Sequence, residues 1–325
     1  MERVGIVIAN TGSPAAPTSE TVADYLGRFL SDPRICPMNP RLWHFILHRF
    51  IIPKRAPVSA KKYASIWTDL GSPLDVGMSS LARKLQASFE EDPSIRCVRY
   101  AASYSAPSME DVLTDCRAHG CDVVVVIPLY PQSALSTTEA VRDKTHGALS
   151  QLGWTPELRF VDAYCDEPLY IASIAHSILE AGFDAESGDE LLFSFHSIPM
   201  ADIRKGDGYD EQCRRTARRI AQELTLDDGA WHMGYQCRFD KSRAWLGPFA
   251  VETMRDASGA RRLFVVAPNF SVDCLETLHD IQAMMKGKWL EGEPNRTSDS
   301  FSYVPCLNDS DAQVRMLHHI VRSSL

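Results

Sequence analysis

The chain has 325 residues, of which 45% are hydrophobic and 23% are charged, a length and composition typical of a globular protein with a substantial core. Its formal net charge of -8 argues against a nucleic-acid-binding protein, because such a surface must neutralise phosphates with Lys and Arg. The nine cysteines include no C-x-x-C pair, so we expect a reduced, cytoplasmic protein rather than a disulfide scaffold.

Apolar runs of strand length alternate with amphipathic helical stretches along the chain. The first run, residues 3–10, lacks the length and the cleavage pattern of a signal peptide and predicts a buried strand. Further strands are predicted at 95–103, 121–130, 158–164, 190–197, 231–236 and 261–270, with helices between them at 78–91, 108–120, 168–182 and 209–225. Because the strands are apolar throughout, they are typical of parallel sheets covered on both faces.

The order of these elements looks duplicated. A strand ending in "ANTGSP" and a later "VVVVIPLYPQ" in the first half correspond to a strand ending in "FSFHSIP" and a later "LFVVAPNFSVD" in the second half. The sequence therefore predicts an α/β protein with two similar doubly wound domains, residues 1–160 and 161–325. Ligands bind beyond the carboxyl ends of strands in such sheets, so we expect the active site in a cleft between the domains.

Residues 41–57, "RLWHFILHRFIIPKRAP", interrupt the pattern by clustering apolar side chains between Arg41 and Lys54. This segment, here named the apolar lip, is too short to cross a bilayer, which needs ~20 apolar residues. Two interpretations remain open. One is a buried core helix; the other is an exposed surface that admits an apolar substrate or contacts a membrane.

Common cofactor motifs are missing from the sequence. There is no G-x-G-x-x-G after a strand, no G-x-x-x-x-G-K-[ST], no H-E-x-x-H and no C-x-x-C. These absences leave a nicotinamide or flavin site, a P-loop, and these zinc motifs without support.

Two groups of polar residues follow strands of the second half. His196 ends the run 190–197, and Asp273, Glu276 and Asp280 follow the last run at spacings that place three carboxylates on one helical face. Structural roles stay open, because acids favour helix N-termini and a histidine near a core is usually structural. Both groups can nevertheless face one site, where a base beside carboxylates suits proton removal coupled to cation binding.

Several motifs resemble the signature blocks of the ferrochelatase family, in the order of that family and over nearly the whole chain. They are "ANTGSPAAPTSETVADYLGRFLSDPRI", "YASIWTDLGSPL", "YPQSALSTTEAV", "FSFHSIP", "YQCRFDKSRAWLGP" and "DCLETLHDI". The resemblance implies a lyase that inserts Fe(II) into a porphyrin to form heme, with two similar doubly wound domains and the active site between them. It agrees with the fold expected from the residues.

The resemblance also implies roles for individual residues. His196 corresponds to the histidine proposed to take protons from pyrrole nitrogens, and Glu276 to the active-site glutamate. Asp273 and Asp280 continue an acidic track, so these four residues form the expected metal-handling set. Oxygen and imidazole ligands bind Fe(II) without holding it as thiolates would.

Other blocks are expected to shape the porphyrin pocket. A core role for the aromatic residues and a helix-capping role for Ser136, Thr137 and Thr138 remain alternatives. The expected substrate-binding residues are Thr11, Tyr63, Ile66, Trp67, Ser136, Thr137 and Trp245.

The chain departs from the family pattern at Asn269, where Gly is common, and at Cys237, where Ser is common. Asn tolerates left-handed geometry, so we expect the turn at Asn269 to be kept. The chain ends in "HHIVRSSL" without a Cys-rich tail, so no [2Fe-2S] cluster and no other tightly bound cofactor are expected.

The apolar lip resembles that of family members that use protoporphyrin IX, and we expect this substrate and peripheral attachment to anionic membranes. Three alternatives remain open: coproporphyrin III as the substrate, a non-catalytic tetrapyrrole carrier on the same scaffold, and a chelatase for cobalt or nickel. The oligomeric state is left undecided by the sequence.

Overall fold

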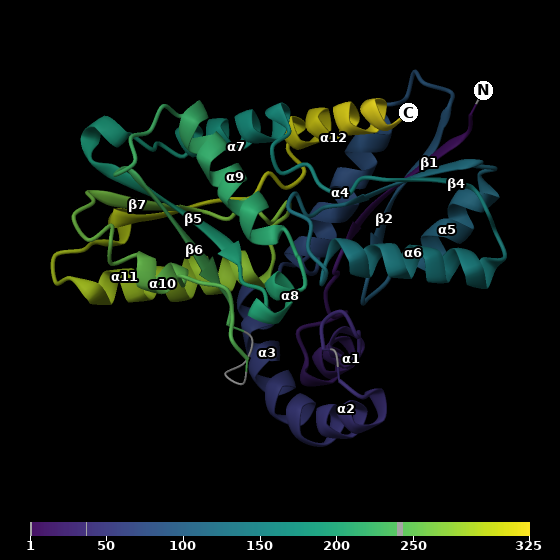
Figure 1. Ribbon diagram of the computed structural model, residues 1–325, viewed down its shortest axis with the longest axis horizontal. Coiled ribbons are helices and arrows are strands. Elements are labelled where there is room, and N and C mark those ends of the chain that lie inside the picture. The colour runs from purple at the N-terminus through teal and green to yellow at the C-terminus, as the bar shows by residue number, and fades with distance from the viewer. Residues whose placement is uncertain (1, 37, 239–242) are drawn as a thin grey trace. The chain divides into compact units, whose positions relative to one another are not determined.

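The structure is a computed structural model that describes residues 2–36, 38–238 and 243–325 (Figure 1). The chain divides into two compact units: unit 1 comprises residues 1–130, 134–162 and 309–325, and unit 2 comprises residues 131–133 and 163–308. Each unit contains a four-stranded parallel sheet flanked by helices, so the predicted fold class is confirmed.

Unit 1 is built around a sheet in the order β2-β1-β3-β4. All seven residues of β1 are buried, which explains why its sequence is apolar up to the terminal Asn10. The unit contains β1 (Val4–Asn10), α1 (Ser19–Leu30), α2 (Pro40–Ile46), the π-helix η1 (Leu47–Ile51), α3 (Ile52–Ile66), α4 (Pro73–Ala87), β2 (Ile95–Ala102), α5 (Met109–Ala118), β3 (Val123–Pro128), α6 (Thr138–Leu152), β4 (Glu157–Phe160) and α12 (Asp311–Ser324).

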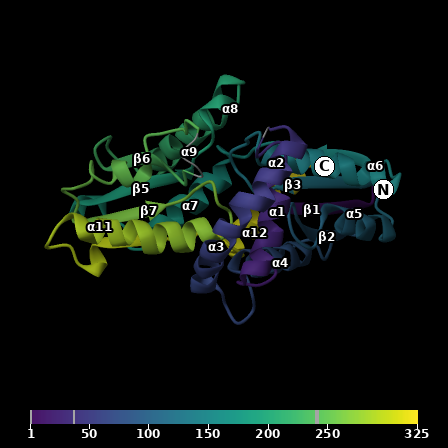
Figure 2. The same ribbon diagram turned by 90° about the horizontal axis from the view of Figure 1, so that it is seen from below.

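Helices cover both faces of this sheet. Apolar side chains of α5 and α6 pack with those of β1, β2 and β3 in one core cluster, and α4 contacts β2 and α12. Figure 2 shows α6 and α4 on opposite sides of β1. The unit is thus a doubly wound α/β layer structure.

Unit 2 repeats the arrangement, with its strands in the order β6-β5-β7-β8. In Figure 1, α7 and α9 lie on one side of its sheet and α10 and α11 on the other. The unit contains α7 (Pro168–Glu180), the 3₁₀ helix η2 (Ala185–Ser187), β5 (Asp189–His196), α8 (Met200–Arg204), α9 (Tyr209–Glu223), β6 (Trp231–Gln236), α10 (Ala250–Thr253), β7 (Arg262–Val266), the π-helix η3 (Glu276–Met285), α11 (Lys286–Gly292), the 3₁₀ helix η4 (Ser298–Ser300) and β8 (Phe301–Val304).

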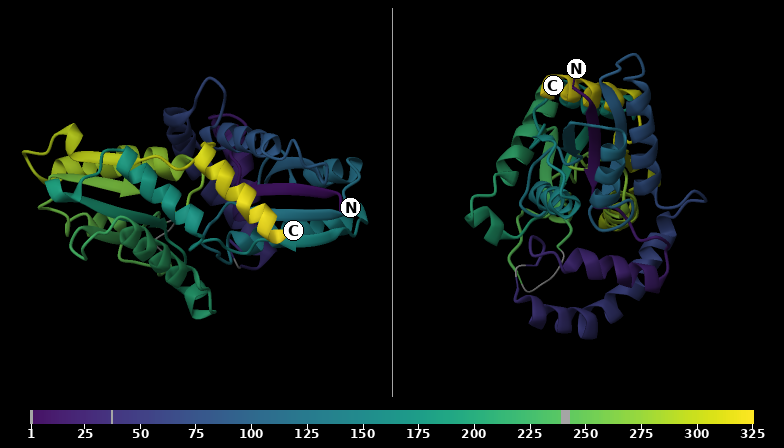
Figure 3. Two further views of the ribbon diagram at one scale, coloured as in Figure 1. Left: turned by 90° about the horizontal axis from the view of Figure 1, so that it is seen from above. Right: turned by 90° about the vertical axis from the view of Figure 1, so that its right-hand side faces the viewer.

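The last helix departs from the predicted division of the chain, which assigned residues 161–325 to the second domain. α12 packs on α4 of unit 1, where Asp309 Oδ2 lies 2.8 Å from Lys84 Nζ and the His318 ring stacks on Phe89 at 4.1 Å. Figure 3 shows α12 in yellow, with both chain termini at the same end of unit 1. Unit 1 is therefore completed by a segment distant in sequence.

Candidate active site

His196 is the last residue of β5 and is partly buried. Its Nδ1 lies 2.6 Å from the backbone oxygen of Ser197. A carbonyl oxygen only accepts, so Nδ1 carries the proton and the neutral imidazole holds its lone pair on Nε2. The Tyr209 hydroxyl donates to the His196 backbone oxygen at 2.9 Å, and the Phe270 ring lies edge-to-face at 6.4 Å. These contacts orient a base at the carboxyl end of the strand.

The acidic segment after β7 differs from the prediction of three carboxylates on one helical face. The helix begins at Leu275 and continues as the π-helix η3, so Asp273 lies outside it. The cause is a pair of hydrogen bonds to residue 308. The backbone N–H of Asp273 donates to Asn308 Oδ1 at 2.8 Å, and the backbone N–H of Asn308 donates to Ser271 O at 3.0 Å. Glu276 and Asp280 lie within the helix about one turn apart and are both partly buried.

Asp273 is buried and held by side-chain donors. Its Oδ1 accepts from the hydroxyls of Thr277 at 2.9 Å and Tyr303 at 2.5 Å, and its Oδ2 accepts from Asn308 Nδ2 at 2.8 Å. Burial, reinforced by Cys306 and Asp273, raises the pKa of Tyr303 well above its usual value, so its hydroxyl remains a donor. The carboxylate therefore fastens the start of η3 to the segment after β8.

Cys237 links the end of β6 to η3. It adopts a left-handed backbone conformation with φ 64°, and its Sγ donates to Asp280 Oδ2 at 3.4 Å. On the preceding turn, burial and then the charge of Glu276 raise the pKa of Cys274 well above its usual value. His196, Cys237 and the acidic helix follow β5, β6 and β7, which are neighbours in the sheet, so they share one edge.

Two further buried groups at this edge were missed as site candidates. Gln236 Nε2 and Asn269 Oδ1 have no hydrogen-bond partner among the described residues, although Gln236 Oε1 accepts from Ser194 at 3.1 Å. The turn expected at Asn269 is kept, with the Phe270 backbone N–H donating to Ala267 O at 3.1 Å, but Asn269 forms it without the left-handed conformation, since it is absent from the positive-φ positions of the described chain. The signal that could have identified them is their position, since Gln236 is the last residue of β6 and Asn269 follows β7.

Trp245 lies in unit 2 and is partly buried. Its backbone forms an antiparallel bridge with Pro199, three residues after His196. The Arg243 guanidinium lies 5.0 Å from the centre of its indole ring. The indole is therefore held on the segment that follows β5.

The remaining predicted substrate residues lie in unit 1. Thr11 follows β1, and both its amide and its hydroxyl donate to Asn10 Oδ1, at 2.7 Å and 3.1 Å. Tyr63 is buried near the end of α3 and packs edge-to-face on Trp67 at 6.3 Å. Trp67 and Ile66 are partly buried. Tyr63 therefore has core character, as the alternative interpretation allowed.

The predicted side-chain cap of α6 is not formed. Thr137 is the N-cap residue, but its φ of -119° and ψ of -78° are far from the usual extended N-cap geometry, and its side chain makes no cap hydrogen bond. Instead its hydroxyl donates to Ala134 O at 3.5 Å. Ser136 is partly buried, whereas Thr138 is fully buried and its Oγ1 is without a partner in the described chain.

The apolar lip combines buried and exposed side chains. Leu47 and Ile52 are buried, whereas Leu42, Phe45 and Phe50 are exposed by 55%, 59% and 51%. Phe45 and Phe50 contact each other edge-to-face at 5.9 Å. Both earlier interpretations thus describe part of the segment. Within the described ranges, no helix combines the length and apolar character needed to span a membrane.

The chain matches the ferrochelatase family over residues 3–325. It is 38% identical to the ferrochelatase of Aromatoleum aromaticum over 100% of this chain and 88% of the relative. It is 39% identical to the ferrochelatase of Vibrio cholerae, covering 99% of this chain and 98% of that one. Ferrochelatase 1 of Shewanella oneidensis is 37% identical, over 98% and 95% of the two chains.

Solved structures support the fold alone. SirB from Bacillus subtilis with Fe³⁺ aligns with a TM-score of 0.59 at 10% identity, covering 100% of this chain and 96% of that one. CbiX aligns with a TM-score of 0.51 at 14% identity, over 100% of both chains. The chain therefore belongs to the ferrochelatase family and is a lyase that inserts iron into protoporphyrin, the terminal step of heme biosynthesis.

Proposed function

We propose that the protein metallates protoporphyrin IX with Fe(II) and that His196 is the base that accepts pyrrole protons. The observation that carries this assignment is the orientation of the imidazole: Nδ1 faces the Ser197 carbonyl at 2.6 Å, which leaves the lone pair on Nε2. Two N–H protons must leave the macrocycle as the metal enters. A neutral imidazole accepts one of them at a time on Nε2 near pH 7 and releases it to water before the next, which ordinary amide or hydroxyl groups cannot do.

Glu276 and Asp280 are the proposed iron-handling carboxylates, acting with His196. Both are partly buried within one helix, and their oxygens bind Fe(II) without the retention expected of a thiolate. Asp273 was predicted as a further metal ligand, and that role stays a prediction. Its three side-chain hydrogen bonds favour a positioning role instead, because each occupies an oxygen lone pair that a metal would need.

The substrate-binding set is proposed to hold the porphyrin through apolar walls and a few polar groups. Trp67, Ile66 and Trp245 are partly buried and supply flat or branched surfaces. The hydroxyl of Thr137 makes no cap bond, and a porphyrin carboxylate would replace its long 3.5 Å hydrogen bond to Ala134 O, with the partly buried Ser136 beside it. Thr11 and Tyr63 complete the set.

His196→Ala tests the catalytic proposal. We expect metallation to fall by at least ~100-fold, the low end of the contribution of a general base, while porphyrin binding stays nearly unchanged. His176→Ala is the matched control, because His176 lies on an exposed helix face of the same unit. Turnover is followed anaerobically with Fe(II) by loss of porphyrin fluorescence, and binding is followed in the absence of metal. Near-normal turnover of His196→Ala would show that a different group is the base.

The choice of protoporphyrin IX over coproporphyrin III rests on the exposed apolar side chains of the lip. Leu42, Phe45 and Phe50 favour vinyl-bearing edges, whereas an ionised carboxylate placed against them without a partner would lose hydration at a higher cost than a neutral polar group. We expect the higher kcat/KM for protoporphyrin IX when both porphyrins are measured in the same detergent. Faster turnover of coproporphyrin III would reverse the substrate assignment. The assignment of the chain to the ferrochelatase family would not change.

The same lip is proposed to attach the protein peripherally to anionic membranes at the cytoplasmic side. Phe45 and Phe50 would enter the interface, while Arg41, Arg49 and Lys54 would remain at the level of the lipid headgroups.

A further inference from the structure

Three thiols of unit 1 meet in its core. Cys97 lies near the start of β2, Cys116 lies on α5, and Cys121 precedes β3. All three are reduced and buried, and Cys121 keeps 5% exposure whereas the other two keep 0%. Thr11 follows the carboxyl end of β1, whereas the thiols lie toward the amino-terminal ends of the strands, so they are separate from the candidate active site.

The sulfur atoms of the three residues are close to one another. Cys97 Sγ lies 3.6 Å from Cys116 Sγ and 3.9 Å from Cys121 Sγ. A Cβ built on Gly5 of β1 would lie 3.0 Å from Cys116 Sγ and 3.1 Å from Cys121 Sγ. Both sulfurs therefore lie over the same point of β1, and the glycine leaves the space in which they meet.

The carboxyl end of α5 brings Cys116 and Cys121 together. Gly120 is left-handed with φ 71°, the backbone N–H of Cys121 donates to Cys116 O at 3.2 Å, and that of Gly120 donates to Arg117 O at 2.9 Å. These two bonds form a Schellman motif, in which the residue after the glycine contacts a side chain of the last helical turn. Cys116 and Cys121 occupy the two contacting positions, so a bond between their sulfurs needs little movement of the backbone.

Cys97 is not placed to form a disulfide with Cys121. It pairs with Gly5 in the ladder of β1 and β2, whereas Cys121 leads into β3 on the other side of β1. Strands two apart lie about 9.6 Å from each other, beyond the Cα separation of about 4.4–6.8 Å that disulfides require. Cys97 therefore contacts both other sulfurs without being the partner of Cys121.

The surroundings of Cys121 favour its thiolate form. Hydrogen bonds with Cys116 and then Cys97 lower the pKa of Cys121, and the charges of His119 and Arg96 act in the same direction. The hydrogen bond with Cys121 raises the pKa of Cys116, whose thiol therefore keeps its proton. Because the thiolate is the nucleophilic form of cysteine, the pair combines one nucleophile with one adjacent thiol.

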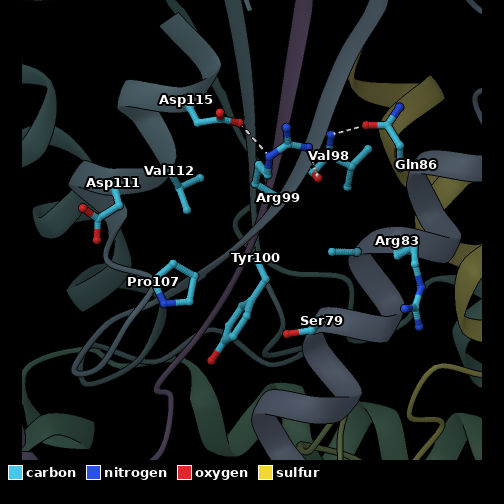
Figure 4. A pocket seen from close by; sticks show the side chains of 11 residues that line it. Ser79, Arg83, Gln86, Val98, Arg99, Tyr100, Pro107, Asp111, Val112 and Asp115 are labelled. Carbon is cyan, nitrogen blue, oxygen red and sulfur yellow. Dashed lines mark hydrogen bonds and ion pairs between the residues drawn. The ribbon is translucent and has the colours of Figure 1, made fainter. Parts of the chain in front are cut away.

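A small oxidant reaches Cys121 from the protein surface. Its chain neighbours are partly exposed at Gly120 and exposed at Asp122. The cavity of about 490 Å³ between α4 and α5 is not the route, because none of the three cysteines lines it. Figure 4 shows its wall, where Arg99 Nε lies 2.6 Å from Asp115 Oδ2.

We propose that Cys121 and Cys116 form a modification site that reacts with hydrogen peroxide and closes to a disulfide. The Cys121 thiolate attacks one peroxide oxygen: an S–O bond forms, the O–O bond breaks, and the leaving hydroxide takes a proton from solvent to become water. The Cys116 sulfur then attacks the sulfenic sulfur of Cys121, and the hydroxyl group leaves with the Cys116 proton as a second water.

The balance of this reaction is two thiols oxidised by two electrons and one peroxide reduced to two waters. The disulfide would fasten the end of α5 to the start of β3, and a thiol reductant would reopen it by exchange. The site does not depend on the proposed roles of His196 or Glu276.

The test exposes the full-length protein, fully reduced and free of iron and porphyrin, to hydrogen peroxide. The chain is then denatured, alkylated, digested and analysed by mass spectrometry. We expect a disulfide between Cys116 and Cys121 with every other cysteine alkylated, and dithiothreitol should reverse it. Cys116→Ser should instead accumulate a sulfenic acid at Cys121 that dimedone traps, and Cys121→Ser should leave Cys116 reduced.

Cys36→Ser is the matched control, because Cys36 is a partly exposed cysteine of the same unit outside the cluster. This variant should form the same disulfide as the wild-type protein, and circular dichroism checks that each variant is folded. Complete alkylation of the wild-type protein after peroxide would overturn the proposal and would leave the three cysteines as small apolar core residues. A disulfide between Cys97 and Cys116 in Cys121→Ser, or oxidation confined to Cys36 or Cys237, would overturn it equally.

Discussion

The substitution Asp273→Asn separates a positioning role from metal ligation. The variant keeps the shape of the side chain but replaces one acceptor oxygen by an amide NH₂ group, which only donates. Asn308 cannot turn to accommodate it, because its Oδ1 accepts from the residue 273 amide at 2.8 Å and its Nδ2 also donates to Cys306 O at 3.0 Å. At least one charge-assisted hydrogen bond is lost and the two others become neutral, so we expect a destabilisation of about 3 kcal/mol.

Thermal unfolding monitored by circular dichroism measures this effect. At about 2–4 °C per kcal/mol for a unit of this size, Tm of the transition that reports unit 2 should fall by about 6–12 °C. Glu276→Gln is the comparison, because the proposed role of Glu276 is metal handling: its Tm should change by less than about 2 °C while turnover falls by at least ~100-fold. Wild-type Tm with abolished metallation in Asp273→Asn would refute the positioning role and establish Asp273 as a ligand.

Two further predictions concern unit 1. Burial raises the pKa of Asp75 to about 6, against the opposing hydrogen bond from Tyr100, so its contribution to stability is complete below the unfolded pKa of about 3.9 and is lost as the pH rises through 6. Asp75→Asn should therefore increase the free energy of unfolding relative to wild type at pH 8, by up to about 3 kcal/mol, and should raise Tm there. At pH 4 it should not raise Tm, and an equal gain at both pH values would contradict this explanation. The double variant Phe45→Ser/Phe50→Ser should lose most co-flotation with anionic vesicles, while exposed Leu179→Ser should retain it; unchanged flotation of the double variant would show that the lip does not bind lipid.

Hydrophobic pattern predicted the sheets well because their strands are buried on both faces. β1, β3 and β7 are short apolar runs bounded by turn residues, a length typical of strands and too short for most helices. β8, "FSYV", was missed, since four residues of which only the first and last are buried give too little signal. The packing of α12 on unit 1 could not be predicted, because an amphipathic pattern shows which face of a helix is buried but does not show which element that face packs against.

The sequence predicted candidate site residues, whose roles stay predictions, and it did not predict their geometry. The position of His196 at a strand end followed from the apolar run before it. The π-helix η3 was unpredictable, because apolar positions in a π-helix and an α-helix differ by less than one residue per turn in spacing. Asp273 was placed on that helix because the tether through Asn308 lies 35 residues away in sequence.

The return of α12 also bears on how the protein is made. Unit 2 needs no residue beyond 308, whereas unit 1 lacks α12 until residues 309–325 have been synthesised. At ~5–20 residues per second, the ribosome takes on the order of ten seconds to produce residues 163–308, and throughout that time the α4 surface that α12 covers is exposed on the nascent chain. The half that emerges second can therefore mature first, and the half that emerges first is the one that would engage chaperones during translation.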